Sequence, residues 1–210
     1  MQQPIFITGI GTGIGKTVVA AIITEAIGGD YWKPVQAGIE GGTDREWVSS
    51  RITKGTNIIY PEAYLLQMAA SPHIAAREEN IRITCAGIVK LMPHTQRPLV
   101  IEGAGGLLVP LNETEFMADL IHHMNARVIL VSRNYLGSIN HSLLAASYCK
   151  SNNIDVMGWV FNDQYMQYEE EIVAWSGFPI IGSIPFNADC NAWFIREQAA
   201  NLRPALMQLI

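Results

Sequence analysis

Nine residues near the N-terminus, from Gly9 to Thr17, have the composition of a loop that binds phosphate. The run reads Gly-Ile-Gly-Thr-Gly-Ile-Gly-Lys-Thr and lies between the apolar residues 4–7 and 18–23. Glycines let successive backbone N–H groups turn inward around an anion, and the start of the following helix adds a positive dipole. Lys16 is expected to reach the terminal phosphates, and Thr17 to offer its hydroxyl to Mg2+. The stretch therefore predicts a P-loop.

The first glycine of this loop lies one residue earlier than in a strict Walker A motif. That motif has glycine five residues before Gly15, where this chain has Ile10, and Gly9 takes its place. The alternative to a P-loop is a tight strand-to-helix turn that ends by chance in Lys-Thr. We favour the P-loop, because four glycines, the Lys-Thr pair and both flanking apolar runs agree with it.

Composition indicates a globular chain without a large charged partner. It has 210 residues, 49% of them hydrophobic, and a formal net charge of −5, which suits one domain spanning residues 1–210. No basic cluster stands out, so we expect no nucleic-acid partner. No run reaches the length of a membrane span, and the start lacks a secretory signal. The three cysteines are widely separated, so we expect separate thiols in a soluble cytoplasmic protein.

Apolar runs alternate with helical stretches along the chain. Several of these runs are apolar throughout, which is typical of strands buried on both faces of a parallel sheet. The sequence therefore predicts an α/β fold, with a doubly wound, mainly parallel sheet of the P-loop NTPase type. Strands are expected at Pro4–Thr8, Tyr31–Val35, Pro98–Glu102, Arg127–Ser132, Val156–Phe161 and Pro179–Ile184. Helices are expected at Lys16–Ile27, Asp44–Thr53, Thr84–Met92, Glu115–His123, Ile139–Lys150, Tyr165–Trp175 and Asn191–Gln208.

Three charged residues near the carboxyl ends of predicted strands could do chemistry, because such sheets bind their ligands there. Lys33 lies at the end of the second strand and is either a solvated cap or a contact to an anion. Asp44 is, in isolation, better explained as a helix N-cap, but a carboxylate near a P-loop could hold Mg2+. Glu102 ends an apolar strand, where a carboxylate packs poorly but suits a magnesium ligand. We favour the functional interpretation of Glu102.

Polar groups also follow the later predicted strands, and these could bind a carboxylate or a base. Ser138 begins a helix whose free N–H groups could bind a carboxylate, or it is an ordinary N-cap. Asn162 follows the fifth strand, and its amide can pair with the edge of a base. The loop at residues 185–187 could complete a base pocket. These positions are therefore candidates to bind a carboxylate and a base.

In these motifs the chain resembles the dethiobiotin synthetase family, the ATP-dependent ligases of biotin synthesis. The resemblance covers nearly the whole chain, and the order and spacing of the motifs together make it specific. Besides the Gly9–Thr17 loop, the matching motifs are Lys33-Pro34-Val35-Gln36-Ala37-Gly38, Ser71-Pro72-His73, Glu102-Gly103-Ala104-Gly105-Gly106, Leu136-Gly137-Ser138-Ile139-Asn140-His141, Gly158-Trp159-Val160-Phe161-Asn162-Asp163 and Gly182-Ser183-Ile184-Pro185.

The resemblance implies a reaction of 7,8-diaminononanoate, CO2 and ATP that releases dethiobiotin, ADP and phosphate. One amine captures CO2 as a carbamate, and a carbamate oxygen attacks the γ-phosphate to give a carbamic–phosphoric anhydride. The second amine then attacks the activated carbon and closes the ureido ring. Mg2+ is the implied cofactor. The implied assembly is a homodimer with its active sites at the interface.

The resemblance also implies roles for individual residues. The catalytic set is Lys33, Lys16 and Thr12, and the magnesium ligands are Thr17, Asp44 and Glu102. The ATP-binding set is Gly13, Ile14, Gly15, Lys16, Thr17, Val18, Asp44, Glu102, Gly103, Ala104, Gly105, Asn162, Asp163, Pro185, Phe186 and Asn187. The substrate-binding set is Thr12, Lys33, Gly105, Leu136, Gly137, Ser138, Ile139, Asn140 and Tyr168, in which the helix start and Tyr168 come from the partner subunit.

The chain departs from the family pattern at a few positions. Ala37 stands where many relatives have Ser or Thr in contact with the carbamate, so one hydrogen bond, worth about 0.5–1.5 kcal/mol, is lost. Nearby Thr43 is a candidate to replace that hydroxyl. Gly13 stands where some members have an acidic residue. The adenine contacts that relatives have near the C-terminus find no clear match after Asn187.

Two other classes of P-loop protein remain as alternatives. A switch ATPase of the partition or septum-placement type has the same fold, but it has an extra lysine early in the loop, where this chain has Gly11. Such proteins often end in an amphipathic membrane tail, whereas residues 202–210 are few and include Pro204. An ATP-dependent domain of the amidotransferase type that acts on corrinoids usually continues into a glutaminase domain. We therefore favour the ligase over both.

Overall fold

The computed structural model describes every residue except 1, 54, 56 and 164–165. Strands and helices alternate along most of the chain. The strands are β1 (Ile5–Gly9), β2 (Asp30–Trp32), β3 (Val35–Ala37), β4 (Ile59–Tyr60), β5 (Tyr64–Leu66), β6 (Leu99–Glu102), β7 (Arg127–Arg133), β8 (Val156–Asn162) and β9 (Ile180–Ile184). The helices are α1 (Lys16–Ile27), α2 (Asp44–Ser49), α3 (Pro72–Glu78), α4 (Cys85–Lys90), α5 (Met117–His123), α6 (Ser138–Ser151), α7 (Glu169–Ser176) and α8 (Ala192–Leu209).

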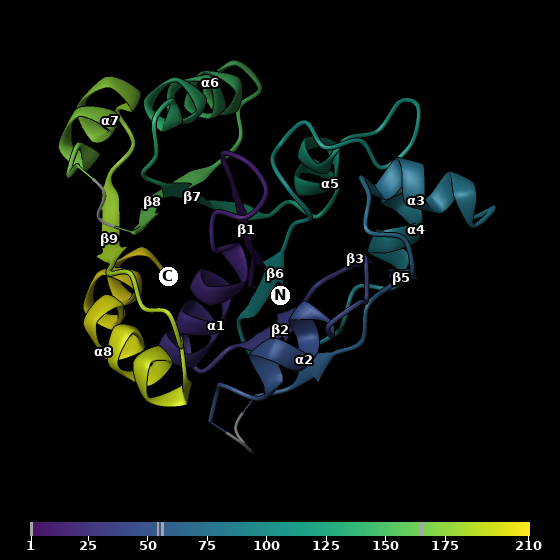
Figure 1. Cartoon of the computed structure of the whole chain (residues 1–210), viewed down its shortest axis with the longest axis horizontal. Coiled ribbons are helices and arrows are strands. Elements are labelled where there is room, and N and C mark those ends of the chain that lie inside the picture. Colours follow the sequence, from purple (N-terminus) through teal and green to yellow (C-terminus); the bar gives the residue numbers. More distant parts are fainter. Residues whose placement is uncertain (1, 54, 56, 164–165) are drawn as a thin grey trace.

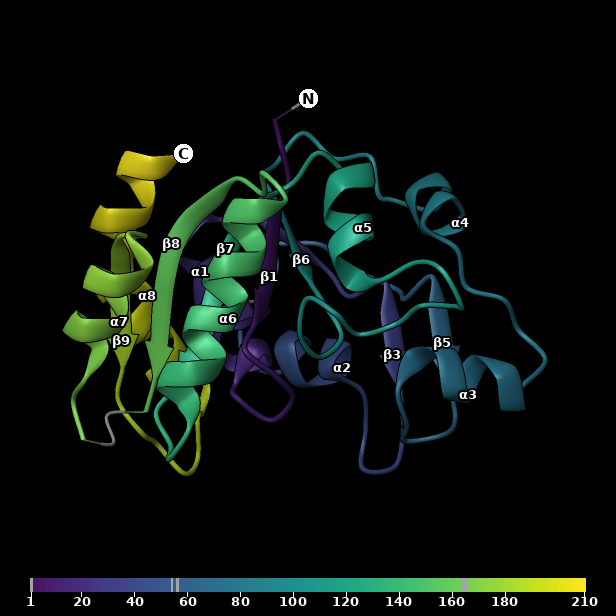
Figure 2. The same cartoon turned by 90° about the horizontal axis from the view of Figure 1, so that it is seen from above.

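A parallel sheet of seven strands forms the centre of the molecule. Its order is β4-β2-β6-β1-β7-β8-β9, and each of its pairings is parallel. Strands β3 and β5 form a separate parallel pair beside this sheet, on the side of α3 (Figure 2). The predicted α/β fold with a mainly parallel sheet is confirmed.

Helices cover both faces of the sheet. Successive residues of a strand pack alternately against the helices on one face and on the other. Helices α5, α6 and α7 lie on one face, whereas α1, α2 and α8 lie on the other (Figure 1). In β1, Ile5 and Ile7 belong to the core beneath α1 and α8, and Phe6 belongs to the core beneath α5 and α6. This alternation follows from the two-residue period of a strand. Because both faces are buried, the strand reads as continuously apolar.

The predicted strand Tyr31–Val35 is two strands in the structure. Strand β2 ends at Trp32, and β3 begins at Val35 and pairs with β5 instead of the main sheet. Pro34 lies in the gap, and because proline has no backbone N–H it cannot donate to a strand ladder. The prediction also missed β4, β5 and α3, which are two, three and seven residues long. Such short elements contain too few residues to display a period.

Helix boundaries differ from the prediction at several ends. Helix α2 ends at Ser49, not Thr53, and α7 begins at Glu169, whereas the predicted start at Tyr165 lies outside the described residues. Helix α8 continues through Pro204 to Leu209, so the proline does not interrupt it. Pro204 is exposed, which lets water reach the carbonyl that loses its helical partner. Among the described residues, no helix is both long and apolar enough to cross a membrane.

Candidate active site

The Gly9–Thr17 loop connects β1 to α1 and has the geometry of an anion cradle. Gly13 and Gly15 have φ values of 73° and 87°, a left-handed conformation that glycine adopts without a steric penalty. Gly15 precedes α1 directly, and no side chain caps that helix. The first N–H groups of α1 therefore have no side-chain partner and are placed for phosphate oxygens.

Asn162, at the end of β8, fastens this loop from the opposite side. Its Nδ2 atom donates to the carbonyl of Ile14 over 2.9 Å. A Cβ atom on Gly15 would lie 1.8 Å from the same nitrogen, so the loop fits against Asn162 only because residue 15 is glycine. Asn162 was predicted to hold adenine. In the structure its amide contacts the backbone of the P-loop.

Glu102 is the centre of a buried hydrogen-bond network at the end of β6. Its side chain is 1% exposed. One carboxylate oxygen, Oε1, accepts from Thr17 Oγ1 at 2.8 Å and from Lys33 Nζ at 3.2 Å. The other, Oε2, accepts from the hydroxyl of Tyr31 at 2.7 Å. A buried carboxylate is stable only when its oxygens are paired in this way.

Lys33 lies in the gap between β2 and β3 and forms ion pairs with Glu102 and Asp44. It is 7% exposed, so it is not a solvated cap. Burial lowers the pKa of Lys33, but Glu102 and Asp44 more than offset that effect, and the pKa lies above its usual value. Lys33 therefore remains a cation at the carboxyl end of the sheet.

Lys16 differs from Lys33 in the direction of its pKa shift. Its Nζ donates to the carbonyl of Gly11 at 2.6 Å, within the P-loop. Burial, the largest cause, and the positive charge of Lys33 lower the pKa of Lys16 to about 8, although the carboxylates of Glu102 and Asp44 act in the opposite direction. Desolvation disfavours the ammonium form. A bound phosphate would supply the negative charge that this ammonium lacks.

The start of α2 positions Asp44, and the helix cap is the preceding residue. Thr43 accepts from the N–H of Glu46 at 3.2 Å, and Glu46 Oε2 accepts from the N–H of Thr43 at 2.8 Å, a capping box. The interpretation of Asp44 as the N-cap is wrong. Thr43 also gives its hydroxyl to Glu46 at 3.1 Å, so it does not replace the hydroxyl missing at Ala37.

The donor set around Lys33 fits a magnesium ion. Glu102, Asp44 and Thr17 provide two carboxylates and a hydroxyl, all joined through the network just described. Among the described residues, no group of three or more His, Cys, Asp or Glu side chains could hold a metal. Mg2+ does not need one, because it retains water and takes phosphate oxygens alongside one or two carboxylates. Lys33 supplies a positive charge to both carboxylates in this structure.

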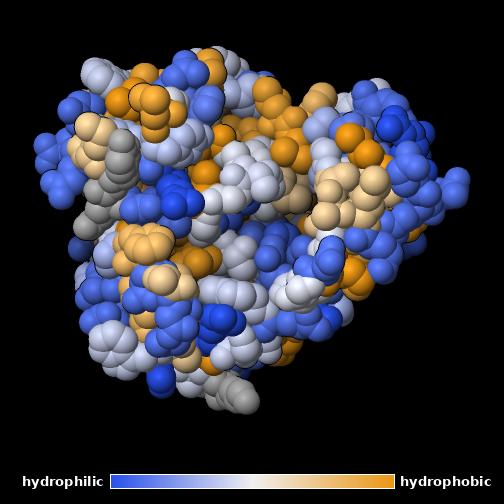
Figure 3. Space-filling view, in the orientation of Figure 1, coloured by the Kyte–Doolittle hydropathy of each residue, from blue (hydrophilic) through white to orange (hydrophobic). Residues whose placement is uncertain are grey.

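Two adjoining cavities meet at this network. One, of about 470 Å³, is lined by the P-loop from Thr12 to Val18, by Trp47 and by Glu102. The other, of about 490 Å³, lies toward β3 and is lined by residues 35–37 and 69–72. Thr12, Lys33, Asp44 and Gly105 line both cavities. The hollow at the centre of the face in Figure 3 has hydrophilic side chains at its floor.

The start of α6 lies apart from this network and has a glycine at its N-cap position. Gly137 precedes the helix with φ 103°, and no side chain caps it. Tyr168 contacts this end directly, because its hydroxyl lies 2.6 Å from Ser138 Oγ and donates to the carbonyl of Tyr135 at 2.9 Å. Ser138 is the first residue of the helix and not its N-cap. The structure thus brings Tyr168 and the helix start together, 30 residues apart in sequence.

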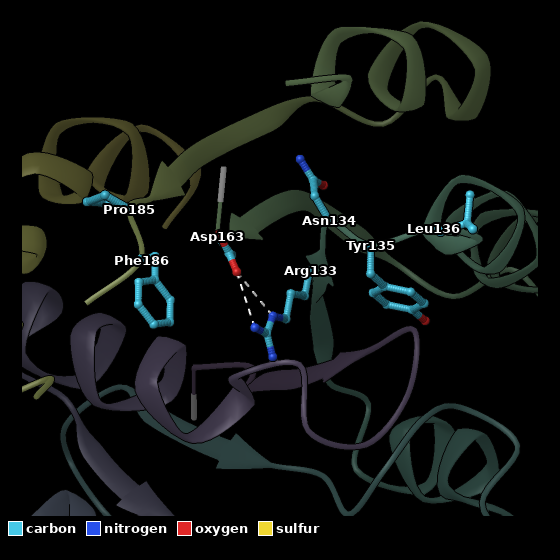
Figure 4. Close-up of a pocket in the computed structure, with 7 residues that line it drawn as sticks. All are labelled: Arg133, Asn134, Tyr135, Leu136, Asp163, Pro185 and Phe186. Carbon is cyan, nitrogen blue, oxygen red and sulfur yellow. Dashed lines mark hydrogen bonds and ion pairs between the residues drawn. The ribbon is translucent and has the colours of Figure 1, made fainter. Parts of the chain in front are cut away.

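A third cavity, of about 570 Å³, lies at the ends of β7, β8 and β9 (Figure 4). Arg133 pairs with Asp163 across it, with Nη2 and Nε 3.2 and 3.3 Å from Oδ2. Pro185 and the exposed ring of Phe186 line another wall. Asp163 was predicted to contact ATP, and in this structure its carboxylate is paired with Arg133.

The remaining predicted positions lie as follows. Gly103 and Ala104 follow Glu102, and a Cβ on Gly103 would lie 2.6 Å from the Phe6 ring. The side chain of Leu136 is 96% exposed. The side chain of Asn187 accepts from the N–H groups of Asp189 and Cys190 at 2.9 Å, so it shapes its own loop.

Sequence reasoning missed Tyr31 and Arg133. Tyr31 was placed in a predicted strand without a role, and Arg133 follows the predicted strand Arg127–Ser132 and was also given none. Tyr31 occurs in an apolar run where an aromatic residue suggests packing, and only its pairing opposite β6 reveals the contact with Glu102. Arg133 ends an apolar strand, as Glu102 does, and that was a signal available in the sequence.

Comparisons with known proteins agree with these features. Residues 3–193 match the family model described as AAA domain. The chain is 53% identical over 169 residues to the ATP-dependent dethiobiotin synthetase BioD of Cytophaga hutchinsonii, which covers 80% of this chain and 81% of that one. It is 41% identical over 210 residues to the ATP-dependent dethiobiotin synthetase BioD of Christiangramia forsetii, with 100% of both chains covered.

Similarity to solved structures extends to a different class of P-loop protein. The fold is similar to the crystal structure of the cell division ATPase MinD of Pyrococcus furiosus, with a TM-score of 0.62, 12% identity and 100% of both chains covered. At that identity the similarity shows a common fold alone, so it does not favour a switch ATPase. The curated relatives match over most or all of their length. The chain therefore belongs to the ATP-dependent dethiobiotin synthetase family, as an ATP-dependent enzyme of that type.

Proposed function

We propose that residues 1–210 form one ligase domain, which converts 7,8-diaminononanoate, CO2 and ATP to dethiobiotin, ADP and phosphate in the cytoplasm. The observation that carries the proposal is the position of Lys33. Its side chain lines both the P-loop cavity and the adjoining cavity beside β3. A cation placed there can contact a phosphoryl group on one side and a carbamate on the other. Transfer between the two ligands needs a shared positive charge at that point.

The first step in this proposal is capture of CO2. One substrate amine attacks the carbon of CO2 and loses a proton, which leaves a carbamate anion in the cavity beside β3. Thr12, whose side chain lines both cavities, donates a hydrogen bond to this carbamate or to the γ-phosphate. Lys33 balances the carbamate charge. Gly105 has a left-handed φ of 67°, and a Cβ atom there would lie 3.4 Å from Thr12 Oγ1, so the absence of a side chain leaves room beside Thr12.

Phosphoryl transfer follows, and the P-loop aligns it. The backbone from Gly13 to Val18 and the Lys16 ammonium hold the β- and γ-phosphates while a carbamate oxygen attacks phosphorus and ADP leaves. The second amine then attacks the carbamate carbon, phosphate leaves, and the ring closes. Positioning and charge neutralisation account for this chemistry, so no protein nucleophile is needed.

Mg2+ suits the donor set of Thr17, Asp44 and Glu102. Bound there, it would neutralise charge on the β- and γ-phosphates. Thr17 is fixed by its 2.8 Å bond to Glu102, and Asp44 by the capped start of α2. After β6, Gly105 lines the P-loop cavity and Ala104 lines the adjoining cavity, and Gly103 connects them to Glu102.

The nucleoside is assigned to the cavity of Figure 4. Asp163, which follows Asn162, lies on one side, and Pro185 and Phe186, which precede Asn187, lie on the other. The exposed Phe186 ring and the flat Arg133 guanidinium are surfaces on which a purine can stack. Asn162 fastens the P-loop, so the base and the phosphates are held by one connected set of residues.

The substrate carboxylate is assigned to the start of α6 in a homodimer. The backbone N–H groups of Ile139 and Asn140 are free of a side-chain cap, and the 14-residue helix directs its positive end toward them. Leu136 and Gly137 form the turn before them. Tyr168 steadies Ser138 in the same subunit. The partner's P-loop would face this end.

An assay of ADP formation tests the proposed reaction. ADP should form only when diaminononanoate, bicarbonate and Mg2+ are all present, and dethiobiotin should appear in equal amount by mass spectrometry. Equal ADP formation without the diamine would overturn the proposal and favour a switch ATPase.

Mixing two inactive variants tests the shared site. Lys33→Gln removes the catalytic cation, and Ile139→Pro removes a substrate-binding N–H at a first-turn position where proline is tolerated. In a two-fold dimer, equal mixing should restore about a quarter of the wild-type sites, because a mixed dimer contains one intact site. Mixtures that stay inactive after subunit exchange would show that each subunit contains its own complete site.

A further inference from the structure

The hydroxyl of Tyr31 donates to Glu102 Oε2 at 2.7 Å, and both side chains are buried, at 0% and 1% exposure. Strand pairing explains the contact. Tyr31 lies opposite Val100 in the β2–β6 ladder, so Glu102 is two residues farther along on the same face. Such diagonal neighbours are about 7–8 Å apart, within reach of an aromatic side chain.

The two oxygens of Glu102 therefore face different surroundings. Oε1 contacts Thr17 and Lys33, and these three residues line the P-loop cavity. Oε2 contacts Tyr31, which does not line that cavity and packs in the core beneath α1. The bond holds the carboxylate so that one oxygen faces the ligand side.

We propose that Tyr31 is a positioning residue that makes Glu102 a one-oxygen ligand and thereby favours Mg2+ over Ca2+ at this site. The inference rests on the metal site of the proposed function. Mg2+ requires a near-octahedral shell at about 2.0–2.1 Å, whereas Ca2+ accepts carboxylates through both oxygens at longer distances. A carboxylate whose second oxygen is engaged by Tyr31 suits the smaller ion.

Metal titrations of Tyr31→Phe test this role. The substitution removes one oxygen atom and keeps the ring. Calorimetry of the protein–ADP complex with Mg2+ and with Ca2+ gives an affinity for each ion. We expect the Mg2+ affinity to fall by about 10–100-fold, as when a partner of a metal ligand is removed. The Ca2+ affinity should fall by less or rise, and ADP binding in EDTA should not change.

Ser176→Ala is the matched control. It removes another buried hydrogen bond, which Trp159 Nε1 donates to Ser176 Oγ over 2.9 Å. This bond joins β8 to α7, away from Glu102. This variant should lose stability without any change in either metal affinity. Bound ligand stabilises a fold, so Tyr31→Phe could fold only as the Mg–ADP complex. In that case the rate of metal release into excess EDTA is compared between wild type and variant in place of the titrations. Tyr31→Met, whose flexible side chain has no hydrogen-bond donor, serves as a second variant in the same measurements.

Two outcomes would overturn the inference. Unchanged affinities in Tyr31→Phe would show that the hydroxyl does not control the metal. An equal fall for Mg2+ and Ca2+ would assign Tyr31 a structural role alone. If the wild-type protein–ADP complex binds neither ion, the metal site of the proposed function fails, and this inference fails with it for a reason that the wild-type titration identifies.

Discussion

The ammonium of Lys33 and the carboxylate of Glu102 meet at 3.2 Å, on the same oxygen that accepts from Thr17. Lys33 and Thr17 of the P-loop thus both contact Oε1 of Glu102, which we propose as a metal ligand. When a divalent cation takes that oxygen, the ammonium loses part of its attraction to the carboxylates and is available to a ligand anion. The network couples metal binding to the position of the lysine that we assign to the reacting group.

Lys33→Gln should separate chemistry from nucleotide binding. The amide is uncharged, so it would not stabilise charge on the transferring phosphoryl group, and we expect kcat to fall by about 10²–10³-fold, as when a transition-state donor is lost. ADP affinity, measured by calorimetry, should persist. Arg45→Gln is the control, because Arg45 pairs with Glu62 at 3.1 Å outside the network. Loss of ADP binding in Lys33→Gln alone would make Lys33 a nucleotide contact.

Nucleotide binding should take up protons above about pH 8. Burial, the largest cause, lowers the pKa of free Lys16 to about 8, and a bound phosphate should raise it again. Calorimetry at pH 8.5 to 9 in two buffers of different ionisation enthalpy measures this uptake, which should vanish near pH 7. Lys33 has a raised pKa and stays protonated across the range. Uptake that is absent at every pH would contradict the assignment.

The same lysine affects stability without nucleotide. The pKa of Lys16 in the folded chain, about 8, lies below its usual value of 10.5, so between these pH values the unfolded chain binds more protons. Stability from this group should therefore rise as pH increases from about 8 to 10.5. Thermal unfolding of wild type and Lys16→Met across this range isolates the effect, because the variant lacks the titrating group.

Thr43→Ala should raise the Mg2+ concentration needed for half-maximal activity. The change removes the cap of α2 and costs about 0.5–2 kcal/mol of stability, and it loosens the helix start that positions Asp44. Thr84→Ala is a matched control, since Thr84 caps α4 in the same way, through a 3.0 Å bond from Gly87 N. A similar loss of stability with unchanged Mg2+ dependence in both variants would refute a role for this cap in the site.

Gly15→Ala should reduce ADP affinity by about tenfold or more, a change of about 1.4 kcal/mol. Its Cβ would lie 1.8 Å from Asn162 Nδ2, so the bond that fastens the P-loop must break. Gly28→Ala at the other end of α1 is the control. It has a similar left-handed φ of 63°, but a Cβ there meets nothing within 4 Å. If both variants bind ADP as wild type does, Asn162 does not shape the loop.

The sequence was sufficient to predict most of the main sheet, the glycine-rich loop between β1 and α1, and the position of Glu102 at the end of a buried strand. Long apolar runs reveal buried strands, and a carboxylate at the end of one has few structural explanations. The sequence was insufficient to predict the contact of Tyr31 with Glu102 or the residue that caps α2, because each contact depends on the folded arrangement of the backbone. Tyr31 reaches Glu102 only through the β2–β6 register. Thr43 rather than Asp44 caps α2 because the local backbone turns one residue earlier.

The interruption at Pro34 divides the active site between two supports. The P-loop and Glu102 belong to the seven-stranded sheet, whereas residues 35–37 of the second cavity belong to the small β3–β5 pair. Residues 64–72 can therefore change the shape of the second cavity while the strands of the seven-stranded sheet keep their register. With this division, substitutions that alter substrate choice can accumulate separately from those that alter nucleotide use. Lys33 lies at the boundary between the two cavities.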